Sequence, residues 1–328
     1  MRPFEYASAA SLAEAAALLG EKQGRSRILA GGTDLITQMQ EGIEQPERVV
    51  NLKGIAGLDR IEIGPEGMRL GPLVSLSTIA AHPGIAAGWR ALAEAAGAAA
   101  SPQIRNAGTL GGNLCQRPRC WYFRNAEFQC RKKGGQECFA LEGENKYHAI
   151  FGSDDCRIVH PSDTAPALLA FEATVTLLSP RGVRELPLEG FFSMPSADVT
   201  RENVLEPDEI LSEIRVPAPS QGTSSLYSKV REKASFDFAL VSCAAVLSFN
   251  GATCTRARLV LGGVAPIPWR CRSAESLLEG RLVDDPLVSR AADEALRGAA
   301  PLSQNRYKVI LARNLLRRSL SALSSPST

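Results

Sequence analysis

Five of the eight cysteines of this chain lie in one stretch that is also rich in arginine and lysine. They are Cys115, Cys120, Cys130, Cys138 and Cys156. Four thiolates can hold either a zinc ion or an iron–sulfur cluster. Zinc sites favour close C-x-x-C pairs, which this stretch lacks, and the intervals of ten, eight and eighteen residues that follow Cys120 suit a long loop around a larger object. The spacing therefore predicts a metal centre, with zinc as the alternative to a cluster.

Other residues of the same stretch fit such a centre. Basic side chains would offset the negative charge of thiolates, and two adjacent glycines would let backbone N–H groups approach the sulfur atoms. These residues are Arg119, Arg124, Arg131, Lys132 and Lys133, followed by Gly134 and Gly135. We expect His148 and His160 to have structural or hydrogen-bonding roles, because four cysteines already complete a cluster. Cys243, Cys254 and Cys271 stand in apolar sequence and are expected to be small buried side chains.

Two glycine-rich segments could hold phosphate. "ILAGGTDL" places Gly31 and Gly32 between an apolar strand and a helix, and "RNAGTLGGN" contains three glycines in a similar setting. Glycine lets a ligand approach the backbone closely, and the free N–H groups at the start of a helix attract an anion. Neither segment is the G-x-G-x-x-G fingerprint, so a Rossmann fold is not indicated. Each segment alone could be a structural turn, whereas the two together could clamp both phosphates of one dinucleotide.

The elements that must position these segments fall into three parts. Residues 1–58 are predicted to form a β-α-β-α-β unit, whose first helix is capped by Ser11 with Glu14 three residues further on. Residues 59–220 contain strands with helices, and the proline-rich "RVPAPSQGTSS" is a linker. Residues 223–328 are predicted to be strands with tight turns, followed by charged helices.

The composition and charge of the chain argue against several classes of function. The chain has 328 residues, 45% of them hydrophobic, which is enough for two or three domains. A formal net charge of only +2 gives no reason to expect a nucleic-acid partner. The first residues lack the apolar core of a signal peptide, and no window approaches the roughly 18–20 apolar residues of a membrane span. We expect no membrane association and no export signal of its own, so a disulfide framework is disfavoured.

Several motifs in order along the chain resemble one family. "PFEY…SLAEAAALL", "ILAGGTDL", "QIRNAGTLGGNL", "HPSD" and "SKVREKASFDFA" are similar to segments of the FAD-binding medium subunit of the xanthine dehydrogenase/oxidase family of molybdenum hydroxylases. The resemblance implies an α+β fold. It consists of a two-subdomain FAD-binding module of the vanillyl-alcohol-oxidase (PCMH) type and a C-terminal α/β domain, with a small antiparallel sheet and helices. The expected parts are 1–58, 59–220 with a cysteine-rich loop at about 114–158, and 223–328.

The resemblance also implies a set of FAD-binding residues and no catalytic residue on this chain. They are Leu29, Ala30, Gly31, Gly32, Thr33, Asp34, Leu35, Ala107, Gly108, Thr109, Gly111, Gly112, Asn113, Asp163 and Lys229. Asp163 matches an aspartate near the cofactor and Lys229 a lysine near the flavin ring. From the residues alone, Asp163 could equally be a helix N-cap before "TAPALLAF", and Lys229 could equally be solvated.

The cysteine-rich loop has its own resemblance. The pattern "RCWYFR…C…C…C…HPSD" is similar to an insertion in the flavin subunits of bacterial aromatic-aldehyde oxidoreductases, and the loop also resembles that of 4-hydroxybenzoyl-CoA reductase. By this resemblance Cys120, Cys130, Cys138 and Cys156 are the ligands of a [4Fe–4S] cluster. Cys115 stands within the second glycine segment and is expected to be a packed thiol.

The function implied is electron transfer within a heterotrimeric molybdenum hydroxylase of the aldehyde oxidoreductase or xanthine dehydrogenase type. A small partner subunit with [2Fe–2S] clusters would deliver electrons to FAD, and a large molybdopterin-binding partner would oxidise the substrate. The alternatives are a 4-hydroxybenzoyl-CoA reductase-type subunit, an independent flavin oxidase of the same fold, and a non-enzymatic zinc or scaffold protein. The expected location is the cytoplasm, or the periplasm by co-export with a partner that carries a twin-arginine signal.

Overall fold

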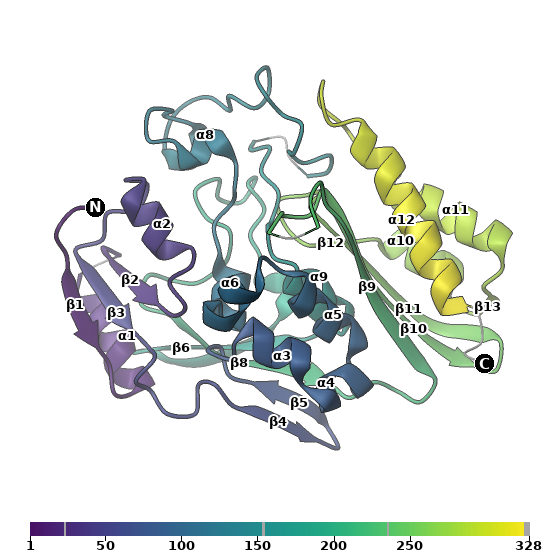
Figure 1. Cartoon of the computed structure of the whole chain (residues 1–328), viewed down its shortest axis with the longest axis horizontal. Coiled ribbons are helices and arrows are strands. Elements are labelled where there is room, and N and C mark those ends of the chain that lie inside the picture. The colour runs from purple at the N-terminus through teal and green to yellow at the C-terminus, as the bar shows by residue number, and fades with distance from the viewer. Residues whose placement is uncertain (23, 153–154, 235, 325–328) are drawn as a thin grey trace.

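The computed structural model describes residues 1–22, 24–152, 155–234 and 236–324, and it contains three sheets that follow one another along the chain (Figure 1). The first sheet is parallel, with the strand order β1-β3-β2. Its elements are β1 (Glu5–Ser8), α1 (Leu12–Glu21), β2 (Ser26–Leu29), α2 (Leu35–Gln40) and β3 (Arg48–Asn51). Parallel neighbours need crossover connections, which the two helices provide. The capping box is confirmed, because Ser11 Oγ accepts from the Glu14 N–H at 3.1 Å and the Glu14 carboxylate accepts from the Ala10 N–H at 2.8 Å.

The second sheet is antiparallel, with the order β4-β5-β8-β6-β7. Its strands are β4 (Ile61–Gly64), β5 (Gly67–Leu70), β6 (Thr174–Ser179), β7 (Gly182–Pro187) and β8 (Ile210–Pro217). The helices of this part are α3 (Leu76–Ala81), α4 (Pro83–Gly88), α5 (Arg90–Ala98), α6 (Pro102–Ala107), α7 (Leu110–Cys115) and α9 (Thr164–Ala170), with a short 3-10 turn, η2 (Leu188–Gly190). Fully buried side chains such as Leu92, Leu168 and Ile214 join these helices to the sheet in one core.

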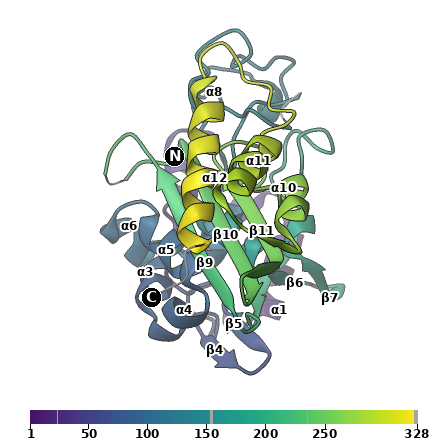
Figure 2. The same ribbon diagram turned by 90° about the vertical axis from the view of Figure 1, so that its right-hand side faces the viewer.

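The C-terminal part is an antiparallel sheet covered by helices. Its strands are β9 (Thr223–Val230), β10 (Val241–Asn250), β11 (Thr253–Gly262), β12 (Trp269–Arg270) and β13 (Arg281–Leu282). Its helices are α10 (Arg272–Leu278), α11 (Asp285–Ala295) and α12 (Tyr307–Ser324). Figure 2 shows α12 lying across the long strands, while α5 and α9 pack against the same sheet from the second part. The α+β fold with a C-terminal antiparallel sheet and helices is therefore confirmed.

The cysteine-rich loop connects α7 to α9 and contains little regular structure. In its described residues, the only regular elements are the short helix α8 (Trp121–Arg124) and the 3-10 turn η1 (Arg131–Lys133), and the loop stands above the sheets in Figure 1. Aromatic side chains pack edge to face within it. The ring centroids of Tyr122 and Phe128 are 5.1 Å apart, as are those of Phe128 and Phe139. Across the described residues, no helix is both long enough and apolar enough to cross a membrane.

Lys308 joins this loop to the C-terminal part. Its side chain is fully buried on α12, where Nζ donates to the carbonyl oxygens of Tyr147 and Gly263, both at 2.7 Å. Burial disfavours the charged form and lowers the pKa of Lys308 from 10.5 to about 7.

The depressed pKa of Lys308 makes the free energy of unfolding depend on pH. Between about pH 7 and 10.5 the unfolded chain holds a proton that the folded chain has released, so the free energy of unfolding should rise with pH. The contribution of this one group should reach about 1.4 kcal/mol per pH unit. Urea unfolding of the wild type and of Lys308→Met across this range would measure the difference. If the free energy of unfolding changed with pH in the same way in both proteins, Lys308 would not be the group responsible.

Candidate functional site

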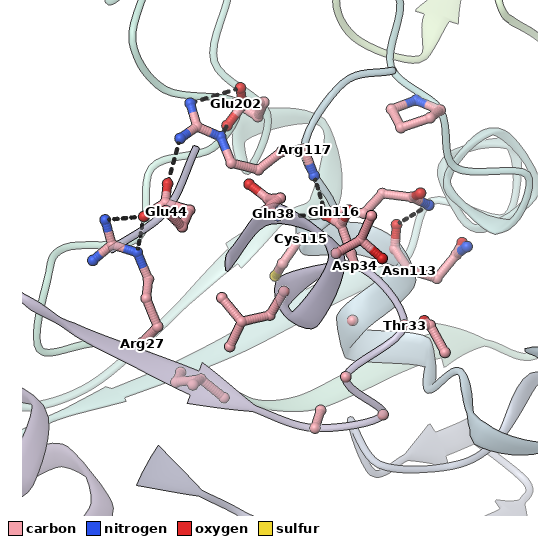
Figure 3. A pocket seen from close by; sticks show the side chains of 18 of the residues that line it. Arg27, Thr33, Asp34, Gln38, Glu44, Asn113, Cys115, Gln116, Arg117 and Glu202 are labelled. Carbon is pink, nitrogen blue, oxygen red and sulfur yellow. Dashed lines mark hydrogen bonds and ion pairs between the residues drawn. The ribbon is translucent and has the colours of Figure 1, made fainter. Parts of the chain in front are cut away.

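A cavity of about 1140 Å³ is lined by both glycine segments and by the cysteine-rich loop (Figure 3). The predicted FAD-binding residues that line it are Ala30, Gly31, Gly32, Thr33, Asp34, Leu35, Gly108, Thr109, Gly111, Gly112, Asn113 and Asp163. The remaining predicted residues, Leu29, Ala107 and Lys229, do not line it. The fold thus gathers two segments that are far apart in the sequence around one space.

The two glycine segments touch through their backbones. A Cβ atom at Gly31 would lie 2.1 Å from the carbonyl oxygen of Ala107, far inside the contact distance of two heavy atoms. Gly32 has a φ of +75°, in the left-handed region where side chains are strained. Position 31 thus needs a glycine because the Ala107 carbonyl lies so close. Position 32 favours a glycine because its φ is positive.

The first segment contains a run of unused donors in residues that line the cavity. Among the described residues, none accepts a hydrogen bond from the backbone N–H groups of residues 31–35, which we call the amide cradle. Successive N–H groups of this kind form a concave site for an anion such as a phosphate. The hydroxyl of Thr33 also lines the cavity and can donate to the same ligand.

The second segment differs from the sequence-based expectation of a second phosphate-binding helix start. The N–H groups of Leu110 and Gly111 donate to the carbonyl oxygens of Val74 and Pro72, both at 2.8 Å. The Gly112 N–H donates to Thr109 Oγ1 at 3.2 Å. These donors are used within the protein, so this segment supplies a closely packed wall and the cradle supplies the amides.

Asn113 is oriented by two hydroxyl groups. Its side-chain oxygen accepts from Ser162 Oγ at 2.5 Å and from Thr164 Oγ1 at 2.6 Å. Within the described part of the chain, its side-chain NH₂ group donates to no residue and so remains for a ligand in the cavity that Asn113 lines.

Asp163 and Lys229 form a buried ion pair at the cavity wall. Lys229 Nζ lies 2.8 Å from Asp163 Oδ2 and donates to the Ala98 carbonyl at 3.1 Å, while the Tyr227 hydroxyl donates to Asp163 Oδ1 at 2.6 Å. Burial raises the pKa of the Asp163 carboxyl, and Lys229 and Tyr227 oppose that rise. Asp163 stands at the N-cap position of α9, as that alternative expected, but its side chain makes no capping hydrogen bond, and Ser162 Oγ accepts from the helix N–H of Ala165 instead. The solvated alternative for Lys229 is wrong, since its side chain is only 3% exposed.

Removing one member of this pair should be costly. Lys229→Met leaves Asp163 without its cation in a buried site, so we expect a loss of about 3–5 kcal/mol of stability at neutral pH. The carboxyl would then take up a proton in the folded state, and the loss should shrink as pH falls. Urea unfolding at pH 7 and pH 5 measures both effects. The double variant Asp163→Asn/Lys229→Met should recover part of the loss, and a single variant as stable as wild type would refute the pairing.

The carboxylate of Asp34, which is labelled in Figure 3, forms hydrogen bonds and ion pairs within the protein. It accepts from the Arg117 N–H at 2.9 Å and from Arg124 Nη2 at 2.7 Å, and it also pairs with Arg119. Burial opposes ionisation, but Arg119 and Arg124 outweigh it and lower the pKa of Asp34. The backbone N–H of Asp34 thus belongs to the cradle, while its side chain binds the cysteine-rich loop.

A second, much smaller cavity lies inside the cysteine-rich loop. It is lined by Cys120, Cys130, Cys138 and Cys156, together with His148 and several aromatic side chains. Cys115 lines the large cavity instead and packs on the core, where burial raises its pKa to about 12. The free space between the four thiols is about 10 Å³, room for about one water molecule. Among the described residues, no three His, Cys, Asp or Glu side chains are grouped so that they could hold a metal ion.

Polar groups favour the ionised form at one of the four thiols, that of Cys138, whereas burial raises the pKa of Cys120 to about 11. The Cys156 thiol donates to the Cys138 sulfur, which lowers the pKa of Cys138 to about 6 and raises that of Cys156. The backbone N–H groups of Arg157 and Ala140 also lower the pKa of Cys138. His148 Nε2 lies 3.2 Å from Cys120 Sγ, which agrees with the hydrogen-bonding role expected for this histidine.

Most of the basic residues expected around the thiols are paired elsewhere. Arg119 and Arg124 bind Asp34, and Lys132 Nζ lies 2.8 Å from the Glu202 carboxylate. Of the five cations, only Arg131 and Lys132 line the small cavity.

The two glycines expected to bring amides to the sulfurs are also committed elsewhere. The N–H groups of Gly134 and Gly135 donate to the carbonyls of Arg131 and Cys130. Gly135 is needed because a Cβ there would lie 1.8 Å from the Gln129 oxygen.

Some residues of the large cavity carry no strong sequence signal. Phe236 and Phe238 line it from the β9–β10 connection, and the Arg119 guanidinium lies 5.1 Å from the Phe238 ring centroid. Arg117 lines it from the cysteine-rich loop. The "SFDF" pair of aromatics within a polar segment is the signal that could have identified the first two.

Comparison with known proteins agrees with this geometry. A family model described as the FAD binding domain in molybdopterin dehydrogenase matches residues 2–219, and one described as the CO dehydrogenase flavoprotein C-terminal domain matches residues 225–323. The chain therefore belongs to the FAD-binding medium subunits of the molybdenum hydroxylases, the family that also contains xanthine dehydrogenase. Proteins of this family are oxidoreductase subunits.

Particular relatives align over almost the whole chain. The aldehyde oxidoreductase FAD-binding subunit PaoB of Escherichia coli (strain K12) is 36% identical over 320 residues, covering 96% of each chain. The carbon monoxide dehydrogenase medium chain of Hydrogenophaga pseudoflava is 31% identical over 324 residues, covering 97% of this chain and 96% of the relative. The solved carbon monoxide dehydrogenase of that organism superimposes with a TM-score of 0.78 at 31% identity, covering 98% of both chains.

The large cavity fits the dinucleotide that this family binds. Its amide cradle suits a pyrophosphate, and its volume of about 1140 Å³ leaves room for groups on either side of the phosphates. When bound, FAD supplies a centre that exchanges electrons in one-electron or two-electron steps.

The contact between the glycine segments predicts the effect of a single methyl group. Gly31→Ala should push the cradle away from Ala107 and weaken FAD binding by at least about tenfold, because the added Cβ overlaps the carbonyl oxygen. Titration of FAD into the cofactor-stripped full chain measures this. Gly88→Ala is the matched control, since a Cβ at that end of α4 meets no atom within 4 Å. Equal FAD affinity in both variants would show that the contact does not shape the site.

Proposed function

We propose that this chain is the electron-transfer subunit of a heterotrimeric molybdenum hydroxylase of the aldehyde oxidoreductase or xanthine dehydrogenase type. It holds FAD in the large cavity and a [4Fe–4S] cluster between Cys120, Cys130, Cys138 and Cys156. Its partners are a large molybdopterin-binding subunit and a small [2Fe–2S] subunit. The chain divides this function among three parts, which are residues 1–58, residues 59–220 with the cysteine-rich loop, and residues 223–328.

The observation that carries the proposal is the convergence of four widely spaced cysteines on one enclosed space next to the cradled cavity. Their donor set is that of a [4Fe–4S] cluster, and backbone N–H groups near cluster sulfurs are typical of such sites. The space between the thiols is small, so cluster insertion would move the thiols apart. Similarity to an aldehyde oxidoreductase FAD-binding subunit supports the aldehyde oxidoreductase type.

The roles of the chain's own residues follow from their contacts. The amide cradle and Thr33 bind the pyrophosphate, and Asn113 donates its NH₂ group to the cofactor. Lys229 holds the carboxylate of Asp163, a cavity-lining residue, in place through their ion pair. The wall of Gly108, Thr109 and Gly112 excludes water from one side of the ligand. An independent flavin oxidase is less well supported, because "ILAGGTDL" offers no histidine to tether a flavin.

Iron analysis of cysteine variants tests the cluster. Serine at position 120, 130, 138 or 156 should remove most iron and labile sulfide from this subunit and abolish the broad absorption near 400 nm, because each thiolate binds one iron. Cys115→Ser is the matched control and should keep both. In the whole complex, about eight irons per FAD are expected, of which about four belong to the small subunit. About four irons per FAD, or one zinc in this subunit, would rule out the cluster.

A further inference from the structure

The two cavities share a thin wall. Phe123 and Lys132 line both of them, and both side chains are buried, with Phe123 only 1% exposed. The guanidinium groups of Arg117 and Arg124 lie 4.7 and 5.7 Å from the Phe123 ring centroid. One side-chain layer therefore separates the four thiols from the flavin cavity.

Ion pairs fix this wall to the first part of the chain. Arg119 and Arg124 bind the Asp34 carboxylate, and Arg117 Nη1 lies 2.8 Å from Glu44 Oε1. Asp34 and Glu44 both belong to the segment that follows the first glycine turn, at the start of α2 and just beyond its end. Cys120 stands between these arginines in the sequence.

The same wall is fixed from the other side by Glu202. This buried carboxylate lies 3.1 Å from Arg117 Nε and 2.8 Å from Lys132 Nζ. Partly buried charges of this kind lose hydration and are costly to leave unpaired, so their geometry is held firmly.

Asp34 belongs to the amide cradle and also contacts the cysteine-rich loop. Its N–H is part of the amide cradle, and its carboxylate is held by the loop that carries the cysteines. A shift of the loop that moves Arg119 and Arg124 must therefore move or release the residue whose amide faces the phosphate.

We infer that Asp34 is a positioning residue that couples the amide cradle to the four-cysteine loop, so that disruption of the thiol set weakens FAD binding through this one carboxylate. The inference rests on the proposed function of both cavities. Coupling between two binding sites is reciprocal, so loss of FAD should also make the cluster easier to remove.

A double-mutant cycle on FAD affinity tests the coupling. The proteins are the wild-type full chain, Asp34→Asn, Cys138→Ser and the double variant. Cys138 is chosen because it is distant in sequence from the arginines that bind Asp34. Cys138→Ser should weaken FAD binding by about tenfold in the wild-type background, within the usual range of site coupling. The same substitution should change the affinity by less than about twofold once Asp34 is Asn.

Asp208→Asn is the matched control. Asp208 also pairs with an arginine, Arg181, and its side chain is 17% exposed against 16% for Asp34, but it lies outside both cavities. In that background Cys138→Ser should keep its full tenfold effect. If Asp34→Asn fails to fold, as judged by its thermal midpoint, Arg119→Gln removes one of the two guanidinium groups that bind the carboxylate and serves in its place.

The reciprocal measurement is iron loss to a chelator with and without FAD. Removal of FAD should speed iron loss in the wild type but not in Asp34→Asn. Additive effects in the cycle, or equal FAD dependence of iron loss in both proteins, would overturn the coupling while leaving the proposed function intact. A wild-type chain that binds no FAD, or a Cys138→Ser variant that keeps all its iron, would instead overturn the proposed function and the coupling with it.

Discussion

The backbone contact between Gly31 and the Ala107 carbonyl is the constraint on which the flavin site depends. It brings the parallel N-terminal unit against the end of helix α6 at a distance that only a glycine allows. The N–H groups of residues 31–35 have no acceptor among the described residues, and all five residues line the cavity. The proposed phosphate site thus depends on how the turn after β2 meets the end of α6.

The cysteine-rich loop completes that site as a third wall. Its arginines place positive charge beside Asp34, Glu44 and Glu202, and each pairing offsets the cost of removing a charged group from water. Such pairs contribute less to net stability than to geometry, since a displaced partner would leave a charge uncompensated. The loop, poor in regular structure, is accordingly held by side chains at defined points of the FAD-binding module.

Sequence patterns predicted the local features well. The capping box at Ser11, the glycine turn before α2 and the separation of Cys115 from the other four cysteines all depend on neighbouring residues or on motif spacing, and the structure shows each of them. The patterns failed where a partner lies far along the chain. Basic residues near cysteines suggested charge compensation of thiolates, yet Arg119 and Arg124 reach a carboxylate about ninety residues earlier.

The amino-acid sequence by itself determined which residues could bind a phosphate or a metal, because those capacities belong to residue type and short spacing. Only the tertiary structure decided which of them remain available. The amides that start α7 are consumed by Val74 and Pro72, whereas those of residues 31–35 are left for a ligand, although both segments have the same glycine-rich character. Lys229 likewise became half of a buried ion pair because β9 places it opposite Asp163. A backbone N–H that donates within the protein is not left for a ligand, and its acceptor is set by which chain segments the fold brings together.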